Sequence, residues 1–380
     1  MKRIPLDYKN YEKIKLVVSD LHLGSGMFLK SGERNVLENF VFDREFSEFL
    51  ENLSFLNEDP DLPVELILNG DVLDFLSVNY KETYFDFISE TVSLTKLKMI
   101  IDGHPDFFDA LSKFISKKNK SITYVVGNHD ADFFFKRVQE HFKLTVGGKE
   151  FAEKINFIDD EPVYRISGGI EIHHGNQFEK IHSFNFSNPF VNKKKQYLDL
   201  PWGSLFIMNV VNRFKKEREH LDQIYPHSIF MLYLLLTDTF FALRFMSYTL
   251  KYFVTTRLIQ LRVKRRLSLL DIPRVIKEEV GALCDGEKIG RDLLMSNKDL
   301  FAVIMGHTHR PKEVRYPSGQ VYVNTGTWMK TVNLDLAAFG RSVRQPFCII
   351  AYPRTKKEEK PLVLLLEWKG TTGPYRYFIS

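Results

Sequence analysis

The chain has 380 residues, of which 44% are hydrophobic, so it can bury the core of one large α/β domain with an insertion or of two smaller domains. Its formal net charge of +5 is small for this length and does not by itself indicate a nucleic-acid-binding protein. The two cysteines, Cys284 and Cys348, exclude a disulfide framework and a cysteine-based metal site, and they favour a reducing compartment.

The N-terminal part of the chain is charged and then becomes β-like. Residues 1–15 lack the apolar stretch of a signal peptide, so we expect a cytoplasmic protein. Residues 14–19 form a β-like run that leads into Asp20 and His22. These two residues are two positions apart, and on an extended backbone they project from the same face.

The next apolar run, residues 66–68, is followed by Asn69-Gly70-Asp71 and, three residues later, by Asp74. Glycine allows a sharp turn at the strand end and leaves Asp71 facing the space above the sheet. A carboxylate at this position has two oxygens and can bridge two divalent cations. A single Gly-Asp after an apolar run is usually only a turn, so this segment gains meaning from the others.

Three later strands have the same layout. Residues 122–126 are followed by Gly127-Asn128-His129-Asp130, residues 170–172 by His173-His174-Gly175, and residues 301–305 by Gly306-His307-Thr308-His309. Residues 75–118 show helical spacing, and the end of the chain is again β-rich. Each segment alone has an ordinary explanation as a polar turn or a surface histidine pair. Five of them in one chain, each beside a glycine, indicate a common site.

The region 192–285 differs from the rest of the chain. It contains no convincing strand, its centre at residues 224–250 is strongly apolar, and basic residues follow over 251–266. The pattern predicts a helical insertion within a catalytic core that comprises residues 1–191 and 286–380.

The candidate ligands at the strand ends are carboxylates, imidazoles and one amide: Asp20, His22, Asp71, Asn128, His174, His307 and His309. This donor set, without a thiolate, suits Mn, Fe or Zn. The chemistry that it allows is two-metal hydrolysis of a phosphoester, in which bound water with a pKa lowered to about 7 supplies the nucleophile.

The five segments resemble the motifs of the calcineurin-like metallophosphoesterases and occur in the order of that family. The matching motifs are Ser19-Asp20-Leu21-His22, Gly70-Asp71-Val72-Leu73-Asp74, Gly127-Asn128-His129-Asp130, His174-Gly175 and Gly306-His307-Thr308-His309. The resemblance implies an α/β fold, a four-layer αββα sandwich, with two divalent metal ions at the strand ends. Mn²⁺ is the expected metal, with Fe and Zn as alternatives.

The resemblance also implies a role for each ligand. One ion is expected at Asp20, His22, Asp71 and His309, and the other at Asp71, Asn128, His174 and His307. His129 is expected to act as general acid or charge stabiliser at the scissile phosphate, oriented by Asp74, because an imidazolium held by a carboxylate can protonate a leaving oxygen. We expect His173, next to His174, to point away from the site.

The expected substrate follows from how the motifs depart from those of related subfamilies. Asp74 is followed by Phe75-Leu76 and the third motif ends in Asp130, which does not fit the protein phosphatases. The opening motif and His174-Gly175 are similar to those of UDP-2,3-diacylglucosamine hydrolases, which cleave a pyrophosphate in a lipid-linked substrate. This chain departs from them at residues 176–179 and in its larger insertion. The alternative is a DNA-processing nuclease of the recombination-repair type, and a non-catalytic scaffold is a third class.

Three interpretations of the insertion remain open in the sequence. It could be a cap that binds an apolar substrate and makes peripheral contact with the inner face of a membrane, where its cationic stretch would meet anionic headgroups. It could instead be a set of helices packed on the core or across a dimer interface. A transmembrane helix is the third reading, although Asp238 and Arg244 interrupt the apolar run at a cost of about 2.5–3.5 kcal/mol each. The oligomeric state and the metal identity do not follow from the sequence.

Overall fold

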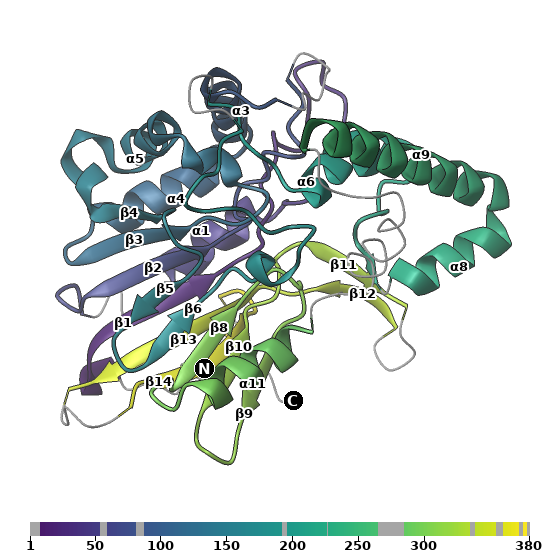
Figure 1. Ribbon diagram of the computed structural model, residues 1–380. Coiled ribbons are helices and arrows are strands. Elements are labelled where there is room, and N and C mark those ends of the chain that lie inside the picture. The colour runs from purple at the N-terminus through teal and green to yellow at the C-terminus, as the bar shows by residue number, and fades with distance from the viewer. Residues whose placement is uncertain are drawn as a thin grey trace.

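The computed structural model describes residues 8–53, 59–80, 87–191, 196–225, 227–264, 285–334, 339–354, 360–371 and 375–377. These residues form two stacked mixed sheets with helices on both outer sides, and a helical hairpin projects from one end (Figure 1). Five short helical segments connect the main elements: η1 (Tyr8–Asn10), η2 (Ala131–Phe134), η3 (Ala152–Lys154), η4 (Asn176–Phe178) and the π-helical η5 (Ile207–Val211).

The larger sheet has seven strands in the order β15-β14-β13-β1-β2-β3-β4. Its strands are β1 (Tyr11–Val18), β2 (Val64–Asn69), β3 (Lys120–Val125), β4 (Ile155–Ile158), β13 (Pro346–Pro353), β14 (Leu362–Trp368) and β15 (Tyr375–Tyr377). β1 to β4 are parallel, and β13 pairs antiparallel with β1. Because parallel neighbours end on the same side, the loops after β1, β2 and β3 meet at one edge of the sheet.

Four helices cover the outer face of this sheet: α1 (Asp43–Glu51), α3 (Glu90–Gly103), α4 (Pro105–Ser116) and α5 (Lys136–Phe151) (Figure 1). The contact is largely aromatic. Phe46 and Phe49 of α1 pack against Trp328, and Phe107 of α4 packs against Phe46. The apolar residues of α1, which include Phe46 and Phe49, therefore belong to the core.

The second sheet has the order β5-β6-β8-β10-β9, with β5 (Tyr164–Ile166), β6 (Ile170–Ile172), β8 (Ala302–Met305), β9 (Lys312–Arg315) and β10 (Val321–Asn324). Its inner face packs on the first sheet, where Ile172 and Ile304 join the same buried cluster as Val17 and Ile67. α11 (Gly286–Ser296) covers its outer face. The predicted four-layer αββα sandwich is thus confirmed.

The predicted insertion contains α6 (Trp202–Phe206), α7 (Asn212–Lys215), α8 (His227–Thr237) and α9 (Thr239–Lys264). α8 and α9 form the projecting hairpin (Figure 1). The expectation of no strand in this region was wrong, because β7 (Ile224–Tyr225) pairs with β11 (Lys330–Asn333), which in turn pairs with β12 (Gly340–Val343). A two-residue strand is too short to leave a period in the sequence, so only the pairing reveals it.

Some predictions for this region lie beyond the described residues. Residues 192–195 and 265–284, where the proposed boundaries and part of the basic stretch fall, are outside them, and so are the side chains of residues 257–264. Among the helices that the structure describes, none is both long enough and apolar enough to span a bilayer.

Candidate metal centre

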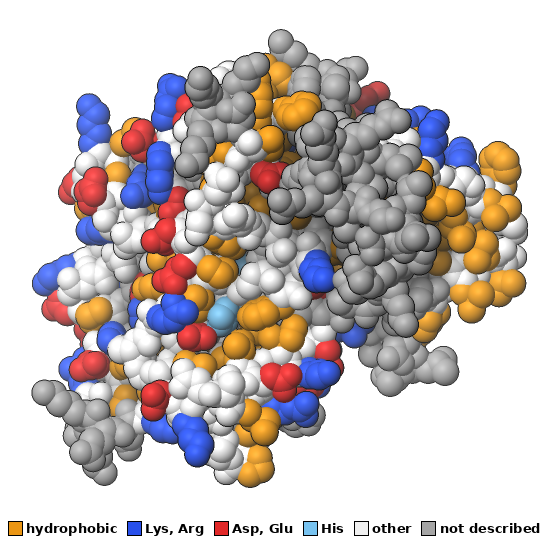
Figure 2. All heavy atoms as spheres, in the orientation of Figure 1, with side chains coloured by type: hydrophobic (Ala, Val, Ile, Leu, Met, Phe, Trp, Pro, Cys, Tyr) orange, Lys and Arg blue, Asp and Glu red, His pale blue; other side chains and the backbone are white. Residues whose placement is uncertain are grey.

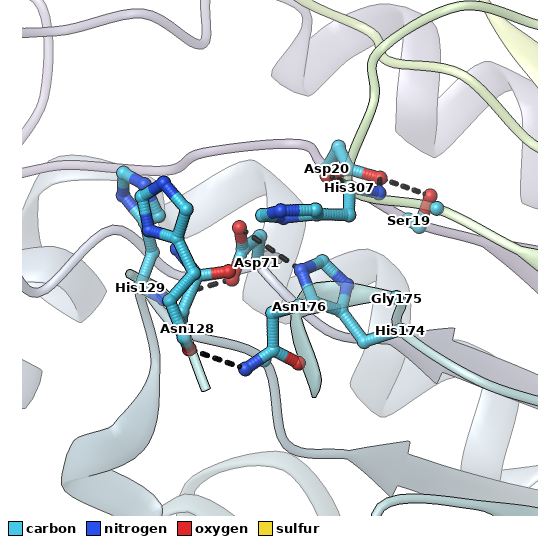
Figure 3. Close-up of polar contacts among 12 residues, drawn as sticks. Ser19, Asp20, Asp71, Asn128, His129, His174, Gly175, Asn176 and His307 are labelled. Carbon is cyan, nitrogen blue, oxygen red and sulfur yellow. Dashed lines mark hydrogen bonds and ion pairs between the residues drawn. The ribbon is translucent and has the colours of Figure 1, made fainter. Parts of the chain in front are cut away.

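The five predicted segments meet at one edge of the sandwich. Asp20 and His22 follow β1, Asp71 follows β2, Asn128 and His129 follow β3, His174 follows β6, and His307 and His309 follow β8. Figure 3 shows Asp71 in the middle, with Asn128 and His129 on one side and His174 and His307 on the other. Ligand-type side chains from both sheets therefore surround one small volume.

The backbone of this edge is unusual. Of the seven non-glycine residues with positive φ in the described chain, five are predicted ligands: Asp20, His22, Asp71, His307 and His309. This conformation costs about 1–3 kcal/mol for each such residue and persists where the surroundings hold it. Here the loops hold one another, because Asp20 N donates to Gly70 O at 3.1 Å and His22 N donates to Asp71 O at 3.0 Å.

At two motif glycines there is no room for a larger residue. A Cβ at Gly70, whose φ is +74°, would lie 2.4 Å from Nδ1 of His174, and a Cβ at Gly127 would lie 2.3 Å from Oδ1 of Asp71. Either side chain would displace a predicted ligand. The glycines of the motifs thus allow the close approach of neighbouring strand ends.

The first cluster consists of Asp20, His22 and His309. Nε2 of His309 lies 3.1 Å from Nε2 of His22 and 3.4 Å from Oδ1 of Asp20. Asp20 is also oriented from behind, because it accepts hydrogen bonds from the Ser19 hydroxyl and from the backbone N–H of His307. The three ligand atoms point into a common space.

The second cluster consists of Asp71, His174 and His307. Nδ1 of His174 lies 2.9 Å from the carbonyl oxygen of Asn69, and its Nε2 lies 3.1 Å from Oδ2 of Asp71. A carbonyl can only accept, so the proton of the neutral ring is on Nδ1 and the lone pair of Nε2 is free for an ion. Asp71 also accepts the backbone N–H of His129 through Oδ1 at 2.8 Å.

Asn128 provides a direct test of whether a metal fits. Its side chain is 1% exposed, and its Oδ1 has no hydrogen-bond partner within the described residues. A buried amide oxygen without a hydrogen-bond donor costs about 1–3 kcal/mol of folding stability, and a bound cation would remove this cost. A divalent cation fits this oxygen and the carboxylate and imidazole donors beside it.

The protonation behaviour of the site agrees with this fit. Burial opposes charge on Asp71, but His174 and other nearby histidines hold the pKa of this carboxyl well below its usual value. Burial likewise opposes charge on His174, but Asp71 and Asp20 raise its pKa to about 10. The same buried carboxylates that raise the pKa of this ring would also attract divalent cations, which would replace the proton on Nε2.

His129 and Asp74 form a pair that adjoins the first cluster, because Nδ1 of His22 lies 3.8 Å from Oδ2 of Asp74. Nδ1 of His129 lies 2.8 Å from Oδ1 of Asp74. Burial opposes the charged ring, but Asp74 and Asp71 raise the pKa of His129 to about 9. Asp74 is 2% exposed, so it is shielded from solvent and holds one orientation of the ring.

Glu179 and His182 also lie at the site, although no motif of the sequence predicts them. Glu179 lies 3.0 Å from Nε2 of His307, and His182 lies 3.7 Å from Glu179, so these three residues form a further group of ligand type. The only sequence signal was that residues 176–179 depart from the fourth motif of the related lipid enzymes. The loop after β6 folds back over His307, and no local pattern predicts that.

The neighbouring motif residues lie elsewhere. Asp130 is buried and accepts hydrogen bonds from Val72 N, Gly127 N and the Tyr124 hydroxyl, which ties the second and third strand-end loops together. His173 contacts Glu171 and Gln177 and belongs to none of the ligand groups.

A cavity of about 440 Å³ begins at this edge and continues into the insertion. Its polar end includes Asp71, His129 and His309. Its other end is lined by apolar side chains of the insertion: Trp202, Phe206, Ile207, Val211, Phe230, Met231 and Phe245. The volume is within the range of small-molecule sites, roughly 300–1,000 Å³.

The comparison with known families agrees with the fold and the site. The profile of the calcineurin-like phosphoesterases matches residues 15–229, which is more than half of the chain. The chain therefore belongs to this family and is a metal-dependent phosphohydrolase with a divalent metal centre. The family implies a small phosphoester as substrate. A search of curated proteins finds no match.

The solved structures that match this chain are distant from it. A dimetal phosphatase from Danio rerio is 10% identical, with 93% of this chain and 98% of that chain covered and a TM-score of 0.36. Vps29 from Chaetomium thermophilum is 9% identical, with coverage of 94% and 92% and a TM-score of 0.32. Calcineurin-like phosphoesterase YfkN from Bacillus subtilis is 11% identical, with coverage of 97% and 88% and a TM-score of 0.29.

Proposed function

We propose that the protein hydrolyses a phosphodiester or pyrophosphate bond in a small molecule that carries an apolar group, with a lipid-linked substrate of the UDP-2,3-diacylglucosamine type as the leading example. Two divalent ions, Mn²⁺ in the first place, would be held at the strand-end cluster. Asp20, His22, Asp71 and His309 would hold one, and Asp71, Asn128, His174 and His307 would hold the other.

When bound, such ions supply Lewis acidity, which activates water at neutral pH and neutralises phosphoryl charge. The chain supplies the geometry around them. Asp71 lies next to both clusters and is fully buried, so its two oxygens can be shared. Nδ1 of His174 is engaged by the Asn69 carbonyl, which leaves Nε2 directed at the site.

His129 would provide the proton for the leaving oxygen. Its Nδ1 is held by Asp74, so the opposite nitrogen, Nε2, is the one available to the substrate, and His129 lines the cavity. The raised pKa keeps this ring protonated at neutral pH, as a general acid requires. Proton donation at Nε2 would convert the departing alkoxide or phosphate into a better leaving group.

The observation that carries the choice of substrate is the two-ended cavity. One part holds the carboxylates and imidazoles, and the other part is lined mainly by apolar and aromatic side chains from α6, η5, α8 and α9. A substrate without an apolar group would leave these apolar side chains in contact with water and would gain no hydrophobic binding energy from them. We therefore propose that the region 192–285 acts as a cap over the core.

The test is a hydrolysis panel with purified protein and Mn²⁺, repeated with Zn²⁺ and Fe²⁺. It contains UDP-2,3-diacylglucosamine, nucleotide diphosphates, cyclic dinucleotides, a short water-soluble phosphodiester and single-stranded DNA. We expect kcat/KM to be highest for the acylated substrate. Equal turnover of the short diester overturns the apolar-substrate proposal, and preferential cleavage of DNA makes the protein a nuclease.

The hairpin of α8 and α9 favours delivery of the substrate from a membrane surface. Its solvent side is rich in apolar residues, visible at the right-hand end in Figure 2. The exposed members are Ile229, Leu232, Tyr233, Leu236, Phe240, Leu243, Met246, Leu250 and Val254. Phe240 is 78% exposed and Leu236 is 77% exposed, which is unusual for side chains of this size that face water.

Vesicle co-sedimentation tests this contact. We expect Leu236→Glu combined with Phe240→Glu to weaken binding to vesicles by about tenfold or more, since burying each such side chain contributes about 1.5–3 kcal/mol. Leu144→Glu is the matched control, because Leu144 is 53% exposed on α5, away from the hairpin. Equal loss in both variants, or no binding by the wild type, contradicts the membrane contact.

A further inference from the structure

The insertion reaches the metal cluster through Tyr225. The hydroxyl oxygen of Tyr225 lies 2.9 Å from Nδ1 of His309, and Tyr225 lines the inner cavity. Tyr225 comes from β7, 84 positions before His309 in the chain. No motif of the sequence includes this residue.

The two nitrogens of the His309 ring face different neighbours. Nε2 lies beside Asp20 and His22, at 3.4 and 3.1 Å, whereas Nδ1 faces Tyr225. If Nε2 is to bind a cation, the ring must carry its proton on Nδ1, and a partner at Nδ1 stabilises this tautomer and the orientation of the ring. The tyrosine oxygen is the acceptor for that proton.

Two independent anchors hold Tyr225 in place. The first is strand pairing, because β7 lies parallel to β11 with Tyr225 opposite Asn333, and the Tyr225 carbonyl accepts Leu334 N at 2.7 Å. A second backbone bond forms two residues before Tyr225, just ahead of β7, where Gln223 O accepts Val332 N at 2.9 Å. The backbone at Tyr225 is therefore fixed to the core.

The second anchor is a buried polar network between the insertion and the core loop at Asn39. Lys215 is 1% exposed in its side chain and donates to Asn39 at 2.9 Å and to Asp222 at 2.8 Å. Gln223 donates to Asn39 at 3.0 Å, and Asn39 donates to Asp222 at 3.2 Å. Such a network is costly to leave half satisfied, so it fixes the segment that carries Tyr225.

We propose that Tyr225 is a positioning residue that the insertion supplies to the metal centre, where it holds His309 with Nε2 free for the ion. The inference rests on the proposed role of His309 as a ligand. The segment next to Tyr225 continues into α8, which contributes Phe230 and Met231 to the cavity. The apolar end of the cavity and one ion site are thus connected by a few residues.

The experiment is a titration of metal-stripped protein with Co²⁺ in the absence of substrate. Binding is monitored by calorimetry and by the visible absorption spectrum. We expect two ions in the wild type. In Tyr225→Phe, one of them should bind about 10–100-fold more weakly, with a changed spectrum, while the other is unaffected. Tyr252→Phe is the matched control, because the Tyr252 hydroxyl accepts from Asn209 within the insertion and does not line the cavity.

A double variant separates positioning from general damage to the fold. Adding Tyr225→Phe to His309→Ala should weaken the affected ion no further than His309→Ala alone, because the tyrosine acts through that ring. Additive losses, or wild-type Co²⁺ affinity in Tyr225→Phe, overturn the inference and leave the metal centre intact. Failure of the wild type to bind two ions would instead refute the proposed centre itself.

Discussion

The strand-end edge and the helical hairpin differ in the kind of side chain that each one buries and exposes. At the edge, charged and polar side chains are buried almost completely, and each is held by neighbours from other strands: Asp20, Asp71, Asn128 and His174 are 0–1% exposed. On the hairpin, large apolar side chains face solvent, and only one side of it contacts the rest of the insertion. A buried charge needs a counter-ion, and an exposed apolar surface needs a cover. The edge therefore carries the groups that chemistry needs, and the role that we propose for the hairpin is to select what reaches them.

The largest effect should come from Asp71→Asn. This change weakens both proposed ions at once, so kcat/KM should fall by about 10⁴-fold or more, given that each ion contributes several kcal/mol to the reaction. Metal analysis should find less than the two ions expected for the wild type. Asp20→Asn is the comparison, because Asp20 belongs to only one cluster and should lose one ion. Full activity in metal-stripped wild type would contradict the whole assignment.

His129→Ala should have the next largest effect. Loss of the general acid lowers kcat by about 10²–10⁴ while both ions stay bound. Asp74→Asn should give a milder form of the same defect, about 10–100-fold, because Asp74 acts through the ring. His173→Gln controls for a buried histidine outside the cavity and should retain activity within about tenfold. Loss of metal in His129→Ala would make this residue a ligand instead.

The cavity allows a more specific test of the proposal that the insertion selects apolar substrates. Met231 lines the apolar end, whereas the next residue, Leu232, is 58% exposed. Met231→Glu should raise KM for an acylated substrate by about 10–200-fold and leave a short diester unaffected, since poorer apolar contact costs about 1–3 kcal/mol. Leu232→Glu should not change the KM for substrate dispersed in detergent. The proposal is refuted if both variants change KM equally, or if Met231→Glu raises KM for the acylated substrate and for the short diester alike.

The smallest effect concerns the scaffold behind the first motif. His104 lies 2.9 Å from Asp43 and 3.3 Å from Glu38, and Glu38 in turn accepts the backbone N–H groups of Gly24 and Gly26. Burial opposes the charged ring, but hydrogen bonds to Asp43 and Glu38 outweigh it and raise the pKa of His104 to about 9.

The sign of the pH dependence follows from this shift. The folded-state pKa of His104 lies above the unfolded value of about 6.5. Its contribution to stability, about 1–3 kcal/mol, is therefore fully present below about pH 6.5 and is lost as the pH rises through about 9. Chemical denaturation of the wild type and of His104→Gln between pH 6 and pH 9.5 should show the difference shrinking with pH. A constant difference would mean that the ring is not charged.

The seven candidate ligands could be predicted from the sequence because they stand in local patterns, and the fold could be predicted because the five motifs resemble those of a known family. An apolar run that ends in glycine and a polar residue is readable within ten positions, and parallel strands place such ends at one edge. The αββα sandwich and the metal-dependent phosphohydrolase class were confirmed, while the substrate, the metal identity and the role of each ligand remain predictions.

Only the tertiary structure decided which other residues join the site. Glu179 contacts His307 because the loop after β6 folds back, and Tyr225 contacts His309 because a two-residue strand pairs with β11. The cavity likewise exists only where α6, η5, α8 and α9 meet the strand ends. These contacts join positions that are far apart in the chain. They form only when the chain folds, so no periodicity or motif in the sequence predicts them.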